Sequence, residues 1–194
     1  MILNKKATSI AEAIVVMLVV VSWVTWMYNI YNKSIQLATW TEYKIKAIQI
    51  AKQWIESFTN IRDTNWLIYS SDYGNCWNSL NYNPWCIWTS NNKIATWKYI
   101  IYKNSNNRWD LASKTNSTFW NWNYNSDFRV WIDSNWIFTQ SWWTNIVPLY
   151  TREINVVNSS STWITIKSLV QWVDNSSSQV RKVELEQVLT NRKK

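Results

Sequence analysis

The chain has 194 residues, a length that suits one globular domain with an anchor segment better than several independent domains. Its formal net charge is +8, but lysine and arginine are scattered along it, so charge identifies no partner and does not specifically indicate DNA. With no His and only two Cys, it lacks the residues of imidazole acid–base catalysis, Cys–His nucleophiles and common zinc sites, so we expect no enzyme, no cofactor and no metal site.

A long apolar segment begins near the N-terminus. Residues 13–32 contain no charged side chain, and residues 13–27 are mostly Val, Ile, Leu, Met and Ala. As a helix, residues 13–32 would be about 30 Å long, which is the thickness of the hydrocarbon core of a bilayer. No cleavage site of the A-x-A type follows, so the segment does not read as a secretory signal peptide. We therefore predict a retained transmembrane helix.

Glu12 interrupts this apolar stretch. A carboxylate at the centre of a membrane helix costs about 2.5–3.5 kcal/mol, so such a residue normally has a partner or a function. The alternative is that Glu12 only marks the edge of the membrane.

The residues before Glu12 resemble the processing site of type IV prepilins and type II secretion pseudopilins. Lys5, Lys6 and Ala7 end a short basic leader, Thr8 follows, and Glu12 is the fifth residue counted from Thr8. The resemblance implies cleavage between Ala7 and Thr8 by a prepilin peptidase and N-methylation of Thr8. It also implies that Glu12 pairs with the N-terminal amine of a neighbouring subunit during assembly. The chain departs from the family in having Ala7 where Gly is usual and Thr8 where Phe is commonest.

The resemblance also implies a domain organisation and a location. The leader would be residues 1–7, the transmembrane and assembly half of a long helix 8–32, its amphipathic half 33–62, and an exported β-rich head 63–194. The expected fold is α+β and pilin-like, with the helix packed on an antiparallel sheet. The protein would cross the bacterial inner membrane once and later join a cell-surface filament. Its partners would be the prepilin peptidase and other pilin or pseudopilin subunits.

Apolar residues continue at helical spacing beyond the membrane segment, with Lys, Gln and Glu between them. This pattern predicts an amphipathic helix that buries one face against its own head. The predicted apolar positions are Leu37, Ile45, Ile48, Ala51 or Lys52, Ile55 and Phe58.

After Asn65 the helical pattern ends, and short apolar pieces alternate with Ser, Asn and Thr, which is typical of strands and turns. Cys76 and Cys86 lie ten residues apart, and we expect a disulfide between them in an exported head; two free thiols are the alternative. Two Cys without His are too few for a metal site.

The clearest strands are near the C-terminus. Residues 164–172 alternate, and residues 179–189 return after a polar turn at 174–178, which predicts a hairpin. Residues 154–156 are expected to add a strand beside it. The residues predicted to share the inner face are Ile164, Ile166, Val170, Trp172, Val183, Leu185 and Leu189.

Glycine and tryptophan are present in unusual numbers, 1 Gly and 18 Trp, whereas Gly makes up roughly 7% of an ordinary soluble domain. Several Trp lie in polar sequences where a turn would favour Gly. Some bacterial lineages decode UGA as glycine, and a gene from such a lineage shows Trp in place of Gly when UGA is translated as tryptophan. Our hypothesis is therefore that many of these positions are glycine in the native protein. The alternative is a genuinely Trp-rich surface that stacks on sugars or bases. The suspected turn positions are Trp85, Trp109, Trp120, Trp122, Trp136, Trp142 and Trp143.

Other tryptophans fit their surroundings or fit either letter. Trp66, Trp77 and Trp172 lie in segments that favour an aromatic residue, and we expect them to be genuine. The helical part tolerates Trp or Gly at four positions: Trp23, Trp26, Trp40 and Trp54.

The leading functional hypothesis is a structural subunit, a minor pilin or pseudopilin of a pilus-like or secretion-like filament. The main alternative is a signal-anchored surface protein whose aromatic-rich head binds carbohydrate or nucleic acid. That alternative requires the tryptophans to be genuine.

Overall fold

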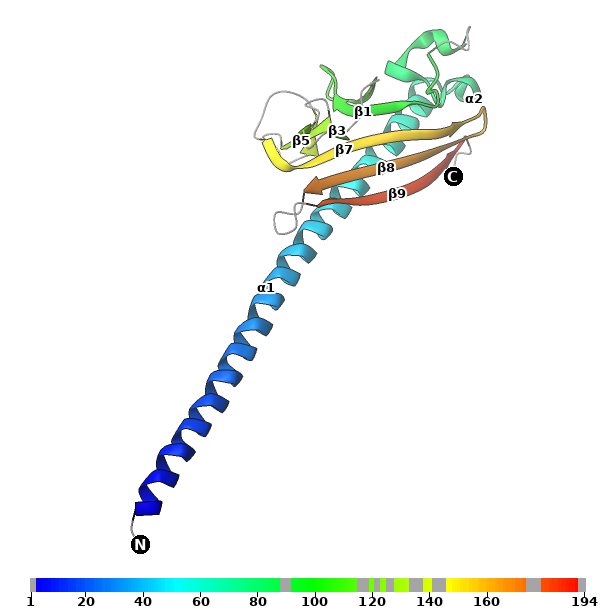
Figure 1. Cartoon of the computed structure of the whole chain (residues 1–194). Coiled ribbons are helices and arrows are strands. Elements are labelled where there is room, and N and C mark those ends of the chain that lie inside the picture. The colour runs from blue at the N-terminus through cyan, green and yellow to red at the C-terminus, as the bar shows by residue number, and fades with distance from the viewer. Residues whose placement is uncertain are drawn as a thin grey trace. The chain divides into compact units, whose positions relative to one another are not determined.

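The computed structural model describes residues 3–87, 92–114, 119–120, 123–124, 128–132, 138–140, 146–173 and 179–191. The chain divides into two compact units, Met1–Tyr43 and Lys44–Lys194. The first unit consists of the N-terminal part of one helix, and the second contains the rest of that helix and the strands (Figure 1).

Helix α1 (Leu3–Ile68) is continuous, and neither Pro nor Gly occurs within it. It extends beyond the predicted end at residue 62, because Ile61 and Asn65 continue its buried face. Within the described residues, α1 is the one helix long and apolar enough to cross a membrane, and its apolar part is exposed. The predicted long N-terminal helix is therefore present.

The second unit is built on an antiparallel sheet of 7 strands. Strands β2, β1, β7, β5 and β6 follow one another, and β7 also pairs with β8, which pairs with β9. A separate pair is formed by β3 (Phe119–Trp120) and β4 (Asn123–Tyr124). The sheet strands are β1 (Lys98–Lys103), β2 (Trp109–Ser113), β5 (Arg129–Ile132), β6 (Phe138–Thr139), β7 (Ile146–Ser159), β8 (Trp163–Val173) and β9 (Val180–Thr190).

The predicted C-terminal hairpin is confirmed. Strands β8 and β9 pair over their whole length, and the predicted strand at 154–156 lies in β7, next to β8. The inner residues of β8 are buried as expected, and Leu189 of β9 is also buried, while Val183 and Leu185 are half-buried. The predicted turn at 174–178 lies outside the described residues. A one-residue shift in the β7–β8 register between Val156 and Asn158 marks a bulge.

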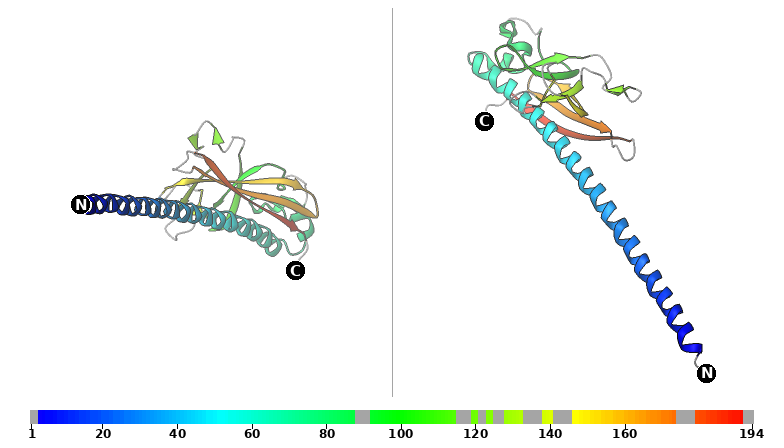
Figure 2. Two further views of the ribbon diagram at one scale, coloured as in Figure 1. Left: turned by 60° about the horizontal axis from the view of Figure 1, so that its bottom comes forward. Right: turned by 90° about the vertical axis from the view of Figure 1, so that its left-hand side faces the viewer.

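The C-terminal part of α1 lies across one face of this sheet (Figure 2). The predicted apolar stripe was partly wrong, because Leu37 and Ile45 are exposed and Ile48 and Ile55 are only half-buried. The buried face is turned around the helix axis relative to the predicted one. Its buried members are Ala47, Ile50, Ala51, Trp54, Ser57, Phe58, Ile61 and Asn65.

One apolar cluster joins α1 to the sheet. Phe58 and Ile61 of the helix pack with Ile154 of β7 and Ile166 of β8, and all four are buried. Trp77 belongs to the same cluster, and its indole Nε1–H donates to the carbonyl oxygen of Ser161 at 3.0 Å. The α+β class predicted from the sequence therefore describes this unit.

Short helices connect α1 to the first strand. They are α2 (Tyr73–Cys76), η1 (Leu80–Tyr82) and η2 (Pro84–Ile87). The amide nitrogen of Asn65 donates to the carbonyl oxygens of Trp77, at 3.3 Å, and Ser79, at 2.9 Å. These bonds fix the connecting segment to the last turns of α1.

Candidate functional site

Of the predicted processing and assembly residues, the structure places all three on α1. Ala7 and Thr8 lie within the helix, and their side chains are outside the described part. Glu12 is exposed, in a run where Ile14, Val15 and their neighbours are also exposed. A carboxylate surrounded by exposed apolar side chains is unsuited to the inside of a bilayer unless another group neutralises it. The geometry therefore leaves Glu12 available to a partner from another chain.

Hydroxyl side chains along the exposed helix satisfy their hydrogen-bonding capacity locally. The hydroxyl of Ser22 donates to the carbonyl oxygen of Leu18 at 2.7 Å, and that of Thr25 donates to the carbonyl oxygen of Val21 at 2.9 Å. Ser34, Thr39 and Thr41 make the same bond to the carbonyl one turn earlier. Such bonds let polar residues remain in an apolar environment without a partner from another helix.

The predicted disulfide is present in the structure. Cys76 and Cys86 are joined with an S–S distance of 2.10 Å, and both are buried. The bridge closes the segment that carries η1, whose residues Asn81 and Tyr82 have positive φ angles of 56° and 49°. A non-glycine residue in this region is uncommon, so the closed loop holds an unfavourable local conformation.

Tyrosine hydroxyls connect this loop to its surroundings. The hydroxyl of Tyr69, just after α1, donates to the carbonyl oxygen of Tyr82, and the hydroxyl of Tyr82 donates to that of Trp109 on β2. Burial and the nearby carboxylate of Asp110 raise the pKa of Tyr82 to about 12. The hydroxyl of Tyr82 therefore stays protonated at neutral pH and available as a donor.

Two carboxylates of the head are buried, and sequence reasoning missed both. Asp110 accepts hydrogen bonds from its neighbour's backbone, Leu111 N at 2.8 Å, and from Asn104 Nδ2 at 3.5 Å, while burial raises its pKa. Glu153 lies 3.3 Å from the ammonium of Lys98; burial raises its pKa, and Lys98 opposes that effect. The two acids lie on different strands, and no group of three or more His, Cys, Asp or Glu that could hold a metal occurs among the described residues.

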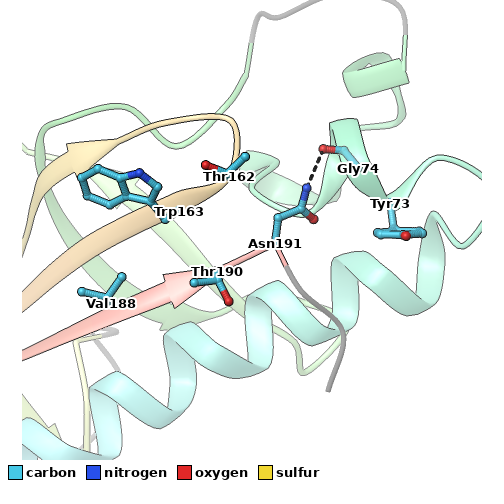
Figure 3. A pocket seen from close by; sticks show the side chains of 7 residues that line it. All are labelled: Tyr73, Gly74, Thr162, Trp163, Val188, Thr190 and Asn191. Atoms are coloured by element: carbon cyan, nitrogen blue, oxygen red, sulfur yellow. Dashed lines mark hydrogen bonds between the residues drawn. The ribbon is translucent and has the colours of Figure 1, made fainter.

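A pocket of about 780 Å³ opens where β8 and β9 meet α2 (Figure 3). Tyr73 and Trp163 present exposed aromatic rings to it, with 46% and 39% of their surfaces accessible. Asn191 closes one side, where its Nδ2 donates to the carbonyl oxygen of Gly74 at 3.3 Å. The remaining lining residues are neutral: Thr162, Val188 and Thr190. The described lining therefore offers aromatic faces, hydroxyls and an amide without a charge, which suits a neutral polar ligand.

Backbone angles bear on the tryptophan hypothesis. Within the described part of the chain, the non-glycine residues with positive φ are Asn81, Tyr82, Asn92 and Asn107. None of them is a tryptophan, so Trp85 in η2 and Trp109 in β2 do not occupy positions that require glycine for this reason. The suspected positions 122, 136, 142 and 143 lie outside the described residues.

No family model, no curated protein and no solved structure matches the chain. Its function must therefore be argued from its own residues.

Proposed function

We propose that the chain is a pilin-like structural subunit, a minor pilin or pseudopilin, that inserts in the bacterial inner membrane and is then drawn into a filament. One observation carries the proposal. A single helix, α1, is apolar and exposed in its first part and forms the core of a sheet-based head in its last part. A helix of this kind can bury its first part only in a bilayer or against other subunits.

Glu12 supports assembly rather than simple anchoring. A single-pass anchor gains nothing from an acid within its apolar stretch, and the unfavourable insertion is offset only when a cation approaches it. The new N-terminal amine of a neighbouring subunit, released by cleavage between Ala7 and Thr8, would provide that cation. Subunits would then align in one register, because each carboxylate accepts one amine.

The test is the N-terminus of the mature protein isolated from its own host. Under the proposal, tandem mass spectrometry finds a chain that begins at N-methylated Thr8. A chain that begins at Met1 would contradict the proposal and leave a signal-anchored protein. As a matched pair, Ala7→Gly, the family's usual residue, should be processed at least as completely as the natural chain, and Ala7→Val should accumulate unprocessed.

The neutral aromatic pocket favours a second candidate function, an anchored head that binds carbohydrate. Aromatic rings stack on the apolar faces of sugars, and the hydroxyls of Thr162 and Thr190 can bond to sugar hydroxyls. Nucleic acid is less suited, because none of the described residues that line the pocket carries a charge to meet a phosphate.

This candidate is tested by titrating the full chain in detergent with a panel of neutral oligosaccharides and with single-stranded DNA. Saturable binding of an oligosaccharide that is lost in Trp163→Gly but retained in Trp97→Gly would support it. Trp97 is a suitable control because it is about as exposed but does not line the pocket. Failure of every oligosaccharide to bind would remove the candidate.

A further inference from the structure

A buried arginine in the head has a side chain without a polar partner in the described part of the chain. Arg152 lies on β7 and is fully buried, and its Nε, Nη1 and Nη2 have no hydrogen-bond partner among the described residues. Its backbone carbonyl oxygen accepts a bond from Gln140 Nε2 at 2.7 Å. Burial lowers the pKa of the guanidinium well below its ordinary value. Buried charges in proteins are normally paired or hydrated, so this arrangement is unfavourable as it stands.

The indole of Trp54 fills the space beside this guanidinium. The central carbon of the Arg152 guanidinium lies 3.1 Å from the centroid of the Trp54 ring. At that distance the guanidinium lies against the face of the indole, which attracts a cation but offers no hydrogen-bond acceptor to its N–H groups. The indole Nε1–H of Trp54 is also buried without a partner. The ring therefore leaves the guanidinium nitrogens without an acceptor and at the same time keeps water away from them.

Trp77 shows how a tryptophan fits the same core. It is as buried as Trp54 and belongs to the same cluster, but its Nε1–H is bonded to the carbonyl oxygen of Ser161. The neighbours of Trp54 on the buried helix face include the small residues Ala51 and Ser57, three positions to either side. A small residue at position 54 would make three consecutive small positions, 51, 54 and 57, along the buried face of the helix.

We propose that residue 54 of the native protein is glycine, and that the space beside Arg152 then forms a hydrated internal site. Water molecules in that space would accept hydrogen bonds from the guanidinium nitrogens. Each water occupies about 30 Å³ and needs two to four polar partners, so a space of indole size holds more than one. Two buried amide oxygens also lack partners: that of Gln53, the residue before position 54, and that of Gln140, whose Nε2 bonds to the Arg152 carbonyl. This proposal is independent of whether the chain assembles into filaments.

The first test compares thermal unfolding of the full chain in detergent with that of two variants. Trp54→Gly would ordinarily lower Tm, because it empties a core position and places glycine in a helix. The proposal expects the opposite, a Tm raised by about 3 °C or more, because the guanidinium nitrogens of Arg152 become hydrated. Trp77→Gly is the matched control, and its Tm should fall by roughly 10 °C. A lower Tm for Trp54→Gly would overturn the hydrated site.

The second test reads the residue directly from protein made in its own host. Trypsin cuts after Lys52 and Arg62, so position 54 is recovered in the peptide of residues 53–62, which contains no other Trp. A tandem mass spectrum with glycine at position 54 supports the proposal, and one with tryptophan overturns it. The peptide that contains Trp77, from the same digest, should retain tryptophan.

Discussion

Asn65 near the end of α1 donates to the carbonyl oxygen of Ser79 across 14 residues of sequence, and its amide is completely buried. The same nitrogen also bonds to the carbonyl oxygen of Trp77. One side chain thus fixes the connecting segment to the helix at Trp77 and Ser79, within the loop that the disulfide closes.

Replacing this amide tests how much it contributes. Asn65→Ala leaves the carbonyls of Trp77 and Ser79 without their donor, so we expect the free energy of unfolding to fall by about 2 kcal/mol. Urea unfolding followed by circular dichroism measures the change. Asn60→Ala, at an exposed position on the same helix, is the control and should change stability little. Equal effects of the two variants would mean that the buried amide adds nothing.

The disulfide should stabilise the head chiefly by restricting its unfolded chain. Cys76 and Cys86 are 10 residues apart, and a closed loop of that length corresponds to about 3 kcal/mol in the chain-entropy model. We therefore expect unfolding at a lower urea concentration after reduction and in the double variant Cys76→Ala with Cys86→Ala. The double variant is also the control for the reductant, because it has no disulfide and its urea midpoint should not change when reductant is added. The expectation would be refuted if the reduced natural chain, with both thiols shown to be free, unfolded at the same urea concentration as the oxidised chain.

The sequence predicted the elements well where a single period dominates. Strand alternation from Ile164 to Trp172 placed β8 and its inner face correctly, because one face of that strand is buried along nearly its whole length. The helix was also located correctly, but its buried face was not. Ile45 is more apolar than Ala47, yet Ala47 is the buried one, because Ala47 precedes Ile50 and Ala51 at helical spacing on the buried face and Ile45 lies on the other side of the helix. Periodicity finds apolar residues on both sides of this helix and does not say which side the head covers.

The buried polar residues could not have been found in this way. In the alternating pattern of β7, Glu153 falls on the face opposite Ile154 and Val156. Nothing in the neighbouring sequence indicates that this face is also covered. Its burial and its contact with Lys98 depend on β1, which lies 50 to 55 residues before Glu153 and pairs with β7 at Tyr99 and Ile154. Arg152 is hidden for the same reason, because its environment is set by α1. By contrast, Cys76 and Cys86 were paired correctly because the chain offers no other combination.

Stability should depend on pH through Glu153. Burial raises its pKa above the ordinary 4.5, so the folded state binds the proton more tightly than the unfolded state. Its contribution is therefore greatest below about pH 4.5 and is lost as the pH rises through the higher pKa of the folded state. Glu153→Gln removes this dependence. The difference in the free energy of unfolding, variant minus natural chain, should therefore be more positive at pH 7 than at pH 4.5. Urea unfolding at both values measures the difference.

The control for that experiment is Glu184→Gln. Glu184 is exposed on β9 and contacts Lys167 at 3.0 Å, an arrangement that contributes little to stability in water. We expect its variant to differ little from the natural chain at pH 7. If Glu153→Gln is less stable than the natural chain at pH 7, the contact with Lys98 outweighs the unfavourable burial, and the proposed sign is wrong.

Loss of the Glu12 charge should prevent assembly while leaving the anchor intact. Glu12→Gln keeps the size of the side chain but removes the charge that an approaching amine would meet. Leaving one member of a buried ion pair without its partner costs about 3–5 kcal/mol, and each 1.4 kcal/mol corresponds to a factor of ten. Surface filaments sheared from the host cells should therefore contain at least tenfold less of this variant, measured by immunoblot. The amount in the membrane fraction should not fall, because a neutral residue inserts more readily than a charged one.

Glu42→Gln provides the matched control, since Glu42 is an exposed acid of the same helix outside the apolar run. Its variant should reach the sheared fraction at the natural level. A general requirement for negative charge on α1 would reduce both variants alike, whereas a specific pairing at Glu12 reduces only the first. If Glu12→Gln is recovered from the surface at the natural level, Glu12 only marks the membrane edge, and assembly must be driven by the apolar side chains alone.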